Sequence, residues 1–244
     1  GDVYKRQVEE KETAAKLELK MPTVRPEKLD AVRTYLTVTR GISPDLVEAE
    51  IANNALYANG FGSAVSVHRD AEGSVYGATW RATKGTLRGN VTGTDKSRGW
   101  FYIGDLKAAR TFVLTEAPIE SLSYYDLHRV EITPETVIIS VSGSSTPKEL
   151  LERIAAVGEE AKIVFAFNKD AAGEKAAMRV LEKYGRFSLL SHKADHIAGA
   201  IEVIPFAGRV EFKISKEGDW NEDLLAARKL ERAVSYTHLR AHET

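Results

Sequence analysis

The stretch Thr-Phe-Val-Leu-Thr-Glu-Ala-Pro at residues 111–118 decides the fold. A continuous apolar run, typical of a buried strand, leads into a proline that suits the first turn of a helix. Two further runs, Val-Ile-Ile-Ser-Val at 137–141 and Ile-Val-Phe-Ala-Phe at 163–167, each precede a segment whose apolar residues have helical spacing. This alternation predicts a parallel sheet with helices on both faces, and a last helix follows Trp220.

We expect this α/β domain to cover residues 109–232 and a smaller α+β domain to cover residues 22–108. In the smaller domain, residues 27–41 and 43–51 have the apolar spacing and end signals of a helical hairpin. The hairpin leads into a largely antiparallel sheet. Its predicted short strands lie at 64–68, 75–80, 85–88 and 100–103.

The two ends of the chain differ in character from the rest. Residues 1–21 comprise an adapter-like start and a predicted charged lead-in helix over 8–20. Residues 1–7 and the tail at 233–244 resemble translated sequencing-adapter read-through. We therefore expect the natural protein to continue beyond one or both ends, and we base no functional argument on these residues.

The composition excludes several classes of protein. The chain has 244 residues, with 34 Lys and Arg against 35 Asp and Glu, so a strongly basic character is excluded for the chain as a whole. Because it has no cysteine, disulfides, iron–sulfur clusters, cysteine-ligated zinc and a thiol nucleophile are excluded. We expect neither zinc nor haem. No apolar run approaches the roughly 20 residues that cross a bilayer, which predicts a cytoplasmic protein without a membrane partner.

Acidic residues follow the predicted strands of the α/β domain. Glu116 comes directly after one strand with Glu120 a helical turn later, Asp170 follows another strand, and Asp219 and Asp223 flank the start of the last helix. Ligands bind beyond the carboxyl ends of strands in open parallel sheets. Carboxylates that converge there suit Mg²⁺ or Mn²⁺ and phosphoryl chemistry. The alternative is that these residues only cap helices and favour their dipoles.

The order and the sequences of these segments resemble those of the Toprim domain of primases, topoisomerases and some nucleases. The resemblance rests on three segments, Thr115–Ser123, Phe165–Ala177 and Asp219–Leu224. Upstream, residues 34–42 and 85–97 look like an uncharacterised domain that precedes Toprim in primase-like proteins of bacterial mobile elements such as plasmids. The resemblance covers about residues 22–230 and implies a Rossmann-like fold and Mg²⁺-dependent nucleotidyl transfer on nucleic acid.

The resemblance also implies roles for individual residues. Glu116 matches the family's glutamate, a metal ligand or general acid/base, and Asp170 matches the second aspartate of its Asp-x-Asp pair. The first aspartate is replaced by Asn168, whose amide oxygen can coordinate a metal but brings no charge. Glu120 stands where close relatives usually have Asp.

The last acidic segment also matches a part of primase-type Toprim domains. Asp219, Asn221 and Asp223 match an Asp-x-Asn segment near the end of those domains. The resemblance therefore implies Glu116 and Asp170 as catalytic residues and Glu116, Asn168, Asp170 and Asp219 as metal ligands. Glu120 and Asp223 would be supporting acids.

A basic stretch at residues 81–110 points to nucleic acid. It has seven Lys and Arg against two Asp, interleaved with the four rings of Trp80, Trp100, Phe101 and Tyr102. Cations for phosphates beside rings for stacking predict a single-strand binding surface. The alternative is a solvated strand face with core aromatics, and alternation makes at least two of the four rings core residues. The predicted binding residues are Arg81, Lys84, Arg88, Lys96 and Arg98.

Three functional hypotheses remain open on the sequence. The first is a primase-like enzyme in mobile-element replication or mobilisation, working with missing parts of a larger protein. The second is a catalytically weakened Toprim domain, with Asn168 in its metal site, that binds DNA or RNA as a module. The third is a regulator that binds free nucleotides and never contacts polymer.

Overall fold

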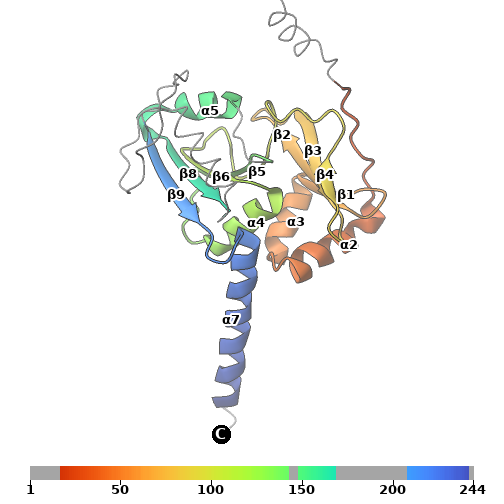
Figure 1. Ribbon diagram of the computed structural model, residues 1–244, viewed down its shortest axis with the longest axis vertical. Coiled ribbons are helices and arrows are strands. Elements are labelled where there is room, and N and C mark those ends of the chain that lie inside the picture. The colour runs from red at the N-terminus through yellow and green to blue at the C-terminus, as the bar shows by residue number, and fades with distance from the viewer. Residues whose placement is uncertain (1–16, 143–147, 169–207, 242–244) are drawn as a thin grey trace, which may run out of the picture.

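The computed structural model describes residues 17–142, 148–168 and 208–241, and within them two sheets lie side by side (Figure 1). The first sheet has strand order β1-β2-β3-β4, and the second has order β5-β7-β6-β8-β9. Arg69 and Trp100 form an isolated antiparallel bridge where the chain passes from one sheet to the other. The predicted fold class, an α/β domain behind a smaller α+β domain, is confirmed.

The first sheet is antiparallel throughout and follows a helical hairpin. Its strands are β1 (Leu56–Ala58), β2 (Ala64–Arg69), β3 (Val75–Arg81) and β4 (Arg88–Asn90). The predicted strand at 85–88 therefore begins three residues later, because residues 82–87 form the connection from β3. The hairpin consists of a 3-10 turn (Pro26–Lys28), α2 (Leu29–Thr34), a π-helical turn (Tyr35–Thr39) and α3 (Pro44–Ala52).

Residues 17–25, which we call the strap, cross one face of the first sheet. The backbone N–H of Lys20 donates to Thr92 O at 3.1 Å, and that of Arg25 donates to Ala58 O at 2.8 Å. Leu19 and Met21 pack on the sheet. The predicted lead-in helix is therefore wrong for residues 17–20, because these alternating apolar side chains bury against the sheet only in an extended chain. Its remaining part, 8–16, lies outside the described residues.

The second sheet is parallel except at one edge. Its strands are β5 (Phe101–Ile103), β6 (Thr111–Thr115), β7 (Thr136–Ser140), β8 (Lys162–Phe167) and β9 (Arg209–Ile214). Strand β5 runs antiparallel to β7, so the strand predicted at 100–103 exists but belongs to this sheet and not to the first. The accompanying helices are α4 (Pro118–Leu127), α5 (Lys148–Ala155), a 3-10 turn (Gly158–Glu160) and α7 (Trp220–Ala241).

The second sheet buries both faces, as continuous apolar strands predict. Phe112 and Leu114 point to the face covered by α5, whereas Val113 between them points to the opposite face. That opposite face shares one core with α4, the start of α7 and the helical hairpin. The two sheets are therefore held together by a common apolar core.

Two further expectations concern the remaining chain. The helical segment predicted after the strand at 163–167 lies outside the described residues. Helix α7 follows Trp220 as predicted and extends away from the rest of the fold (Figure 1). In the described ranges, no helix combines the length and apolar character needed to cross a bilayer.

Candidate functional site

Two neighbouring parallel strands bring Glu116 and Asn168 together. Strands β6 and β8 pair in parallel with Leu114 opposite Phe165, so the residues that follow them lie at the same edge of the sheet. The backbone N–H of Asn168 donates to Glu116 Oε1 at 3.1 Å. The sequence predicted this edge as the site, and the structure brings these two residues into direct contact.

Glu120, in the first turn of α4, connects the two strand ends. Its Oε2 accepts a hydrogen bond from the backbone N–H of Glu116 at 3.2 Å, and its Oε1 accepts one from Asn168 Nδ2 at 3.3 Å. Burial raises the pKa of Glu120 to about 7, and the nearby charges of Glu116 and Asp219 add to the increase. Glu120 therefore holds a proton for a large part of the time near neutral pH.

The side chain of Asn168 leaves one polar atom without a partner. Its Oδ1 is buried and accepts no hydrogen bond from the residues that the structure describes. The other end of the amide is occupied, because Nδ2 donates to Glu120 Oε1 at 3.3 Å. A buried acceptor without a partner is costly, and an amide oxygen is an atom of the kind that binds a hard metal ion.

Asp219 and Asn221 come to the same edge from the start of α7. Trp220 between them fixes the helix, because its Nε1 donates to Ala166 O of β8 at 2.8 Å. Asp219 Oδ1 accepts from the backbone N–H of Glu222 at 2.8 Å and so caps the helix, which agrees with the structural alternative for this residue. Its side chain nevertheless lines the same cavity as Glu116.

Two of the predicted acidic residues are not brought to this place by the described structure. The carboxylate of Asp223 accepts hydrogen bonds from the backbone N–H groups of Lys216 and Glu217 at 2.8–3.0 Å, so it supports the loop before α7. It does not line the cavity. Asp170 lies outside the described residues.

A cavity of about 560 Å³ separates these acids from the first sheet, and we call it the intersheet cavity. Its acidic wall consists of Glu116, Glu120, Asn168 and Asp219. Its arginine wall consists of Arg40, which follows the π-helical turn, with Arg81 and Arg88 from the first sheet. Arg81 and Arg88 are direct partners in the pairing of β3 with β4, so they lie on one face.

In the arginine wall, Arg40 is fixed by hydrogen bonds, whereas Arg81 has an N–H donor without a partner among the described residues. Arg40 donates from Nε to the hydroxyl of Tyr35 at 2.8 Å and from Nη1 to Asn221 Oδ1 at 3.1 Å. The Nε of Arg81 is buried without a hydrogen-bond partner among the described residues. Planar guanidinium groups without a carboxylate partner are suited to bind phosphate.

The other predicted binding residues lie elsewhere. Lys96 Nζ donates to Ser142 O at 2.8 Å, and Arg98 Nη2 donates to the hydroxyl of Tyr76 at 2.6 Å. Lys84 lines a second cavity. Of the five predicted cations, Arg81 and Arg88 line the intersheet cavity. Of the four interleaved rings, Trp100 and Phe101 are core residues, as alternation predicted for at least two of them.

Sequence reasoning missed Arg40 as a wall residue. It lies far in the chain from both the basic stretch and the acidic clusters, and only the contact with Asn221 brings it to the cavity. The one available signal was its place within the segment at 34–42 on which part of the resemblance rests.

The acidic wall offers oxygen atoms of the kind that bind a divalent metal ion. Carboxylate and amide oxygens suit Mg²⁺, and the Oδ1 of Asn168 lacks a partner among the residues that the structure describes. However, no three Asp, Glu or His side chains among the described residues are close enough to hold a metal ion together. The described donors are therefore of the right kind but do not complete a metal site by themselves.

Comparisons with known proteins agree with this architecture. Residues 34–109 match the model of a protein family of unknown function, DUF3991, and residues 113–224 match the model described as Toprim-like. No curated protein matches the chain.

Solved primase structures share the fold. A structure of the DnaG primase catalytic domain bound to ssDNA has a TM-score of 0.51 and 15% identity, covering 88% of this chain and 73% of that one. The RNA polymerase domain of Mycobacterium tuberculosis primase DnaG has a TM-score of 0.50 and 14% identity, covering 84% and 76%. The chain thus carries a DUF3991 segment followed by a Toprim-like domain.

Proposed function

We propose that this chain binds single-stranded nucleic acid in the intersheet cavity and catalyses metal-dependent nucleotidyl transfer on it. The observation that carries the proposal is the opposition of an acidic wall and an arginine wall across one cavity. The arginines would hold the backbone of the template strand. Near the acids, the terminal hydroxyl of a growing chain would attack the α-phosphate of a nucleoside triphosphate and release pyrophosphate. The fold shared with a primase domain whose structure holds ssDNA supports this proposal.

The roles of the residues follow from their positions. Arg81 and Arg88 would bind backbone phosphates, and Arg40 would fix a further phosphate near the strand ends. Glu116 would accept or hold the proton of the attacking hydroxyl, since its carboxylate is half-buried at the edge of the cavity. Glu120 would keep Asn168 oriented through their 3.3 Å hydrogen bond.

A Mg²⁺ or Mn²⁺ ion would complete the site. Glu116, Asn168 and Asp219 would hold it together with Asp170, which the sequence puts two residues after Asn168. When bound, the ion would neutralise charge on the phosphate oxygens. In the cell we expect the reaction to serve replication or mobilisation of mobile elements, together with other parts of a larger protein.

A metal titration and an incorporation assay test this proposal together. We expect the full chain to bind Mn²⁺ or Mg²⁺ in a calorimetric titration and to incorporate labelled nucleoside triphosphates on a single-stranded template. Asp170→Ala should remove both properties. Incorporation that persists in Asp170→Ala, or its absence from both the wild type and Asn168→Asp, would overturn the proposed reaction.

A second candidate function is favoured by Asn168 itself. Because an amide brings no charge, the site has one carboxylate fewer than the family pattern. The chain would then bind single-stranded nucleic acid without catalysing a reaction on it. This function predicts that the wild type binds oligonucleotides but forms no product, whereas Asn168→Asp gains both metal affinity and incorporation.

A further inference from the structure

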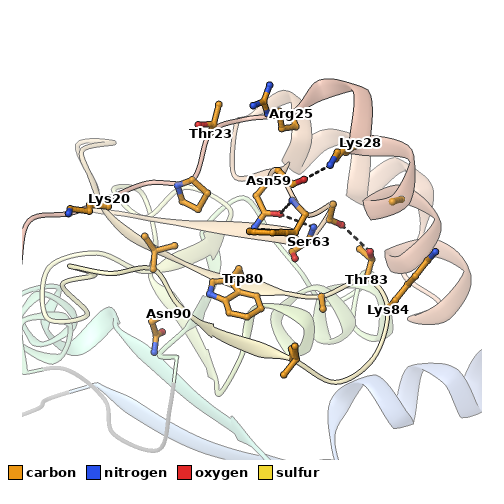
Figure 2. Close-up of a pocket in the computed structure, with 18 of the residues that line it drawn as sticks. Lys20, Thr23, Arg25, Lys28, Asn59, Ser63, Trp80, Thr83, Lys84 and Asn90 are labelled. Carbon is orange, nitrogen blue, oxygen red and sulfur yellow. Dashed lines mark hydrogen bonds between the residues drawn. The ribbon is translucent and has the colours of Figure 1, made fainter.

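A second cavity lies on the opposite face of the first sheet. It has a volume of about 1,100 Å³, and Figure 2 shows side chains from the strap, the loop after β1 and the end of β3 around it. Side chains alternate along β3, so Arg81 points to the intersheet cavity while Trp80 belongs to the opposite face with Val65 and Ala78. We call this cavity the far-face groove.

Positive charge dominates the lining of the far-face groove. Lys20, Arg25, Lys28 and Lys84 line it, whereas Glu27 is its one acidic lining residue in the described structure. Within the described ranges, the side chains of Lys20, Arg25 and Lys84 are exposed and have neither an ion pair nor a hydrogen bond. Cations with no internal partner, gathered on one cavity, suit a polyanion.

An aromatic ring lies between these cations. Trp80 is half-buried, whereas Trp100 and Trp220 are only 5% and 4% exposed. Its indole lies over Gly89 on β4, where an added Cβ would approach the ring to 3.2 Å, so the missing side chain makes room for the ring. Figure 2 shows the indole among the side chains that line the groove. A ring that is accessible on one side is a stacking platform for bases.

The lining of the groove is held in shape by its own hydrogen bonds. Asn59 Oδ1 accepts the backbone N–H groups of Phe61 and Ser63 at 2.9 and 3.0 Å, and Thr83 Oγ1 donates to Gly62 O at 3.0 Å. Phe61, on the same loop, is 93% exposed. The groove is thus a preformed recess with an apolar residue at its rim, which favours binding of a chain with both rings and charges.

The two cavities meet at the edge strand of the first sheet. Trp80 and Asn90 line both of them, and β4 is the last strand of the sheet. We propose that the far-face groove is a second binding site for single-stranded nucleic acid, reached by a strand that leaves the intersheet cavity over β4. This inference rests on the proposed function, because it extends the strand bound there. Lys20, Arg25 and Lys84 hold its phosphates, and Trp80 stacks on a base.

Binding of a long oligonucleotide to the full chain tests the groove. Lys20→Ala with Lys84→Ala removes two groove cations, and Lys107→Ala with Lys229→Ala removes two exposed lysines outside both cavities. For an oligothymidylate of about 20 nucleotides, the groove variant should lower the slope of log K against log salt by about 1.4, that is two phosphates at about 0.7 each. At ~0.1 M salt this corresponds to about 10- to 30-fold weaker binding. The control variant should bind like the wild type.

Tryptophan fluorescence gives an independent readout. Because Trp80 is the half-buried indole of the three, stacking should quench the emission of the wild type but not that of Trp80→Phe. An oligonucleotide of the same length without bases should bind without this quenching. Oligouridylate in place of oligothymidylate distinguishes RNA from DNA as the preferred strand. Polyglutamate that binds and quenches equally well would overturn the inference, because it carries charge but no bases.

The experiments can refute the proposed binding role of the far-face groove and that of the intersheet cavity independently. If the groove variant matches its control while Arg81→Ala with Arg88→Ala weakens binding, the far-face site is overturned and the proposed function stands. If the groove variant weakens binding and the arginine variant does not, the groove is supported and the binding role of the intersheet cavity is overturned. If neither variant differs from the wild type, both are overturned.

Discussion

The acidic wall and the arginine wall of the intersheet cavity are built by opposite means. The acids follow parallel strands, are tied to one another by hydrogen bonds, and hold a carboxyl whose pKa is raised to about 7. Arg81 and Arg88 instead stand on an antiparallel sheet as direct cross-strand partners, without an ion pair in the described structure. The acidic wall is thus preorganised, at a cost in folding free energy for burying a carboxyl. The arginine wall keeps the charges of Arg81 and Arg88 available for a binding partner.

This difference indicates a division of labour. A network of tightly held acids suits chemistry, because reacting groups must be fixed before the reaction begins. Arginines without internal partners suit affinity, because each can form a new phosphate contact when nucleic acid arrives. Changes in the two walls should therefore affect different measured quantities, the rate for one and the dissociation constant for the other.

The largest effect is expected from Glu116→Gln. The amide keeps an oxygen that can accept the N–H of Asn168, so the fold should be unchanged, but it can no longer take a proton. We expect the rate of nucleotide incorporation to fall by about 10²- to 10⁴-fold. The affinity for single-stranded DNA, measured by fluorescence anisotropy, should stay within about twofold of the wild type.

The matched control for this variant is Glu159→Gln, which changes an exposed carboxylate outside the cavity. It should leave both rate and affinity unchanged. An equal rate in Glu116→Gln and Glu159→Gln would contradict the assigned role, and a large loss of affinity in Glu116→Gln would contradict the division between the walls.

A smaller effect is expected from Arg81→Ala with Arg88→Ala. Loss of two phosphate contacts should lower the salt slope of binding by about 1.4 and weaken affinity about 10- to 30-fold at ~0.1 M salt. Arg98→Ala with Lys107→Ala is the control, since Arg98 contacts Tyr76 outside the cavity. If both pairs weaken binding equally, the basic stretch acts as one surface, as the sequence suggested, and the arginine wall has no special role.

The smallest effect concerns stability and a carboxyl outside both walls. Glu50 is 5% exposed, and burial raises its pKa to about 7, with Arg69 partly opposing the shift. Because the folded state holds this proton more tightly than the unfolded state, the native protein loses stability as pH rises through 7. Between about pH 6 and pH 8 the loss from this group should be about 1 kcal/mol.

Glu50→Gln should remove that part of the pH dependence, as measured by urea denaturation at both pH values. Glu72→Gln, in an exposed turn, provides the control. A wild-type stability that changes with pH no differently from that of Glu50→Gln would show that water reaches Glu50 in the folded protein.

Much of the second sheet could be predicted from the sequence, since its signals are local. Continuous apolar runs marked β6, β7 and β8, and Pro118 marked the start of α4. The contact between Glu116 and Asn168 followed from one topological rule, because carboxyl ends of parallel strands share an edge. The acidic wall was therefore largely predictable, apart from Asp223, whose backbone contacts depend on the fold of its loop.

The first sheet and its surroundings were less predictable, since their structure depends on distant partners. Residues 17–20 have the composition of a solvated helix, yet Leu19 lies extended on the sheet because it packs against residues far along the chain. Charge alone grouped Lys96 with Arg81, but Lys96 does not itself line the intersheet cavity and instead donates from Nζ to Ser142 O. Arg40 entered the cavity through a contact with Asn221 that no local pattern predicts.

The position of β5 determines whether the two matched segments of the chain can be separated. Phe101–Ile103 lie within the segment that matches the family of unknown function, but they form the edge strand of the Toprim-like sheet. A gene fusion or fragment that begins at residue 113 would leave β7 with an open edge, ready to pair with other chains. We therefore expect a protein divided at the boundary between the two segments to aggregate.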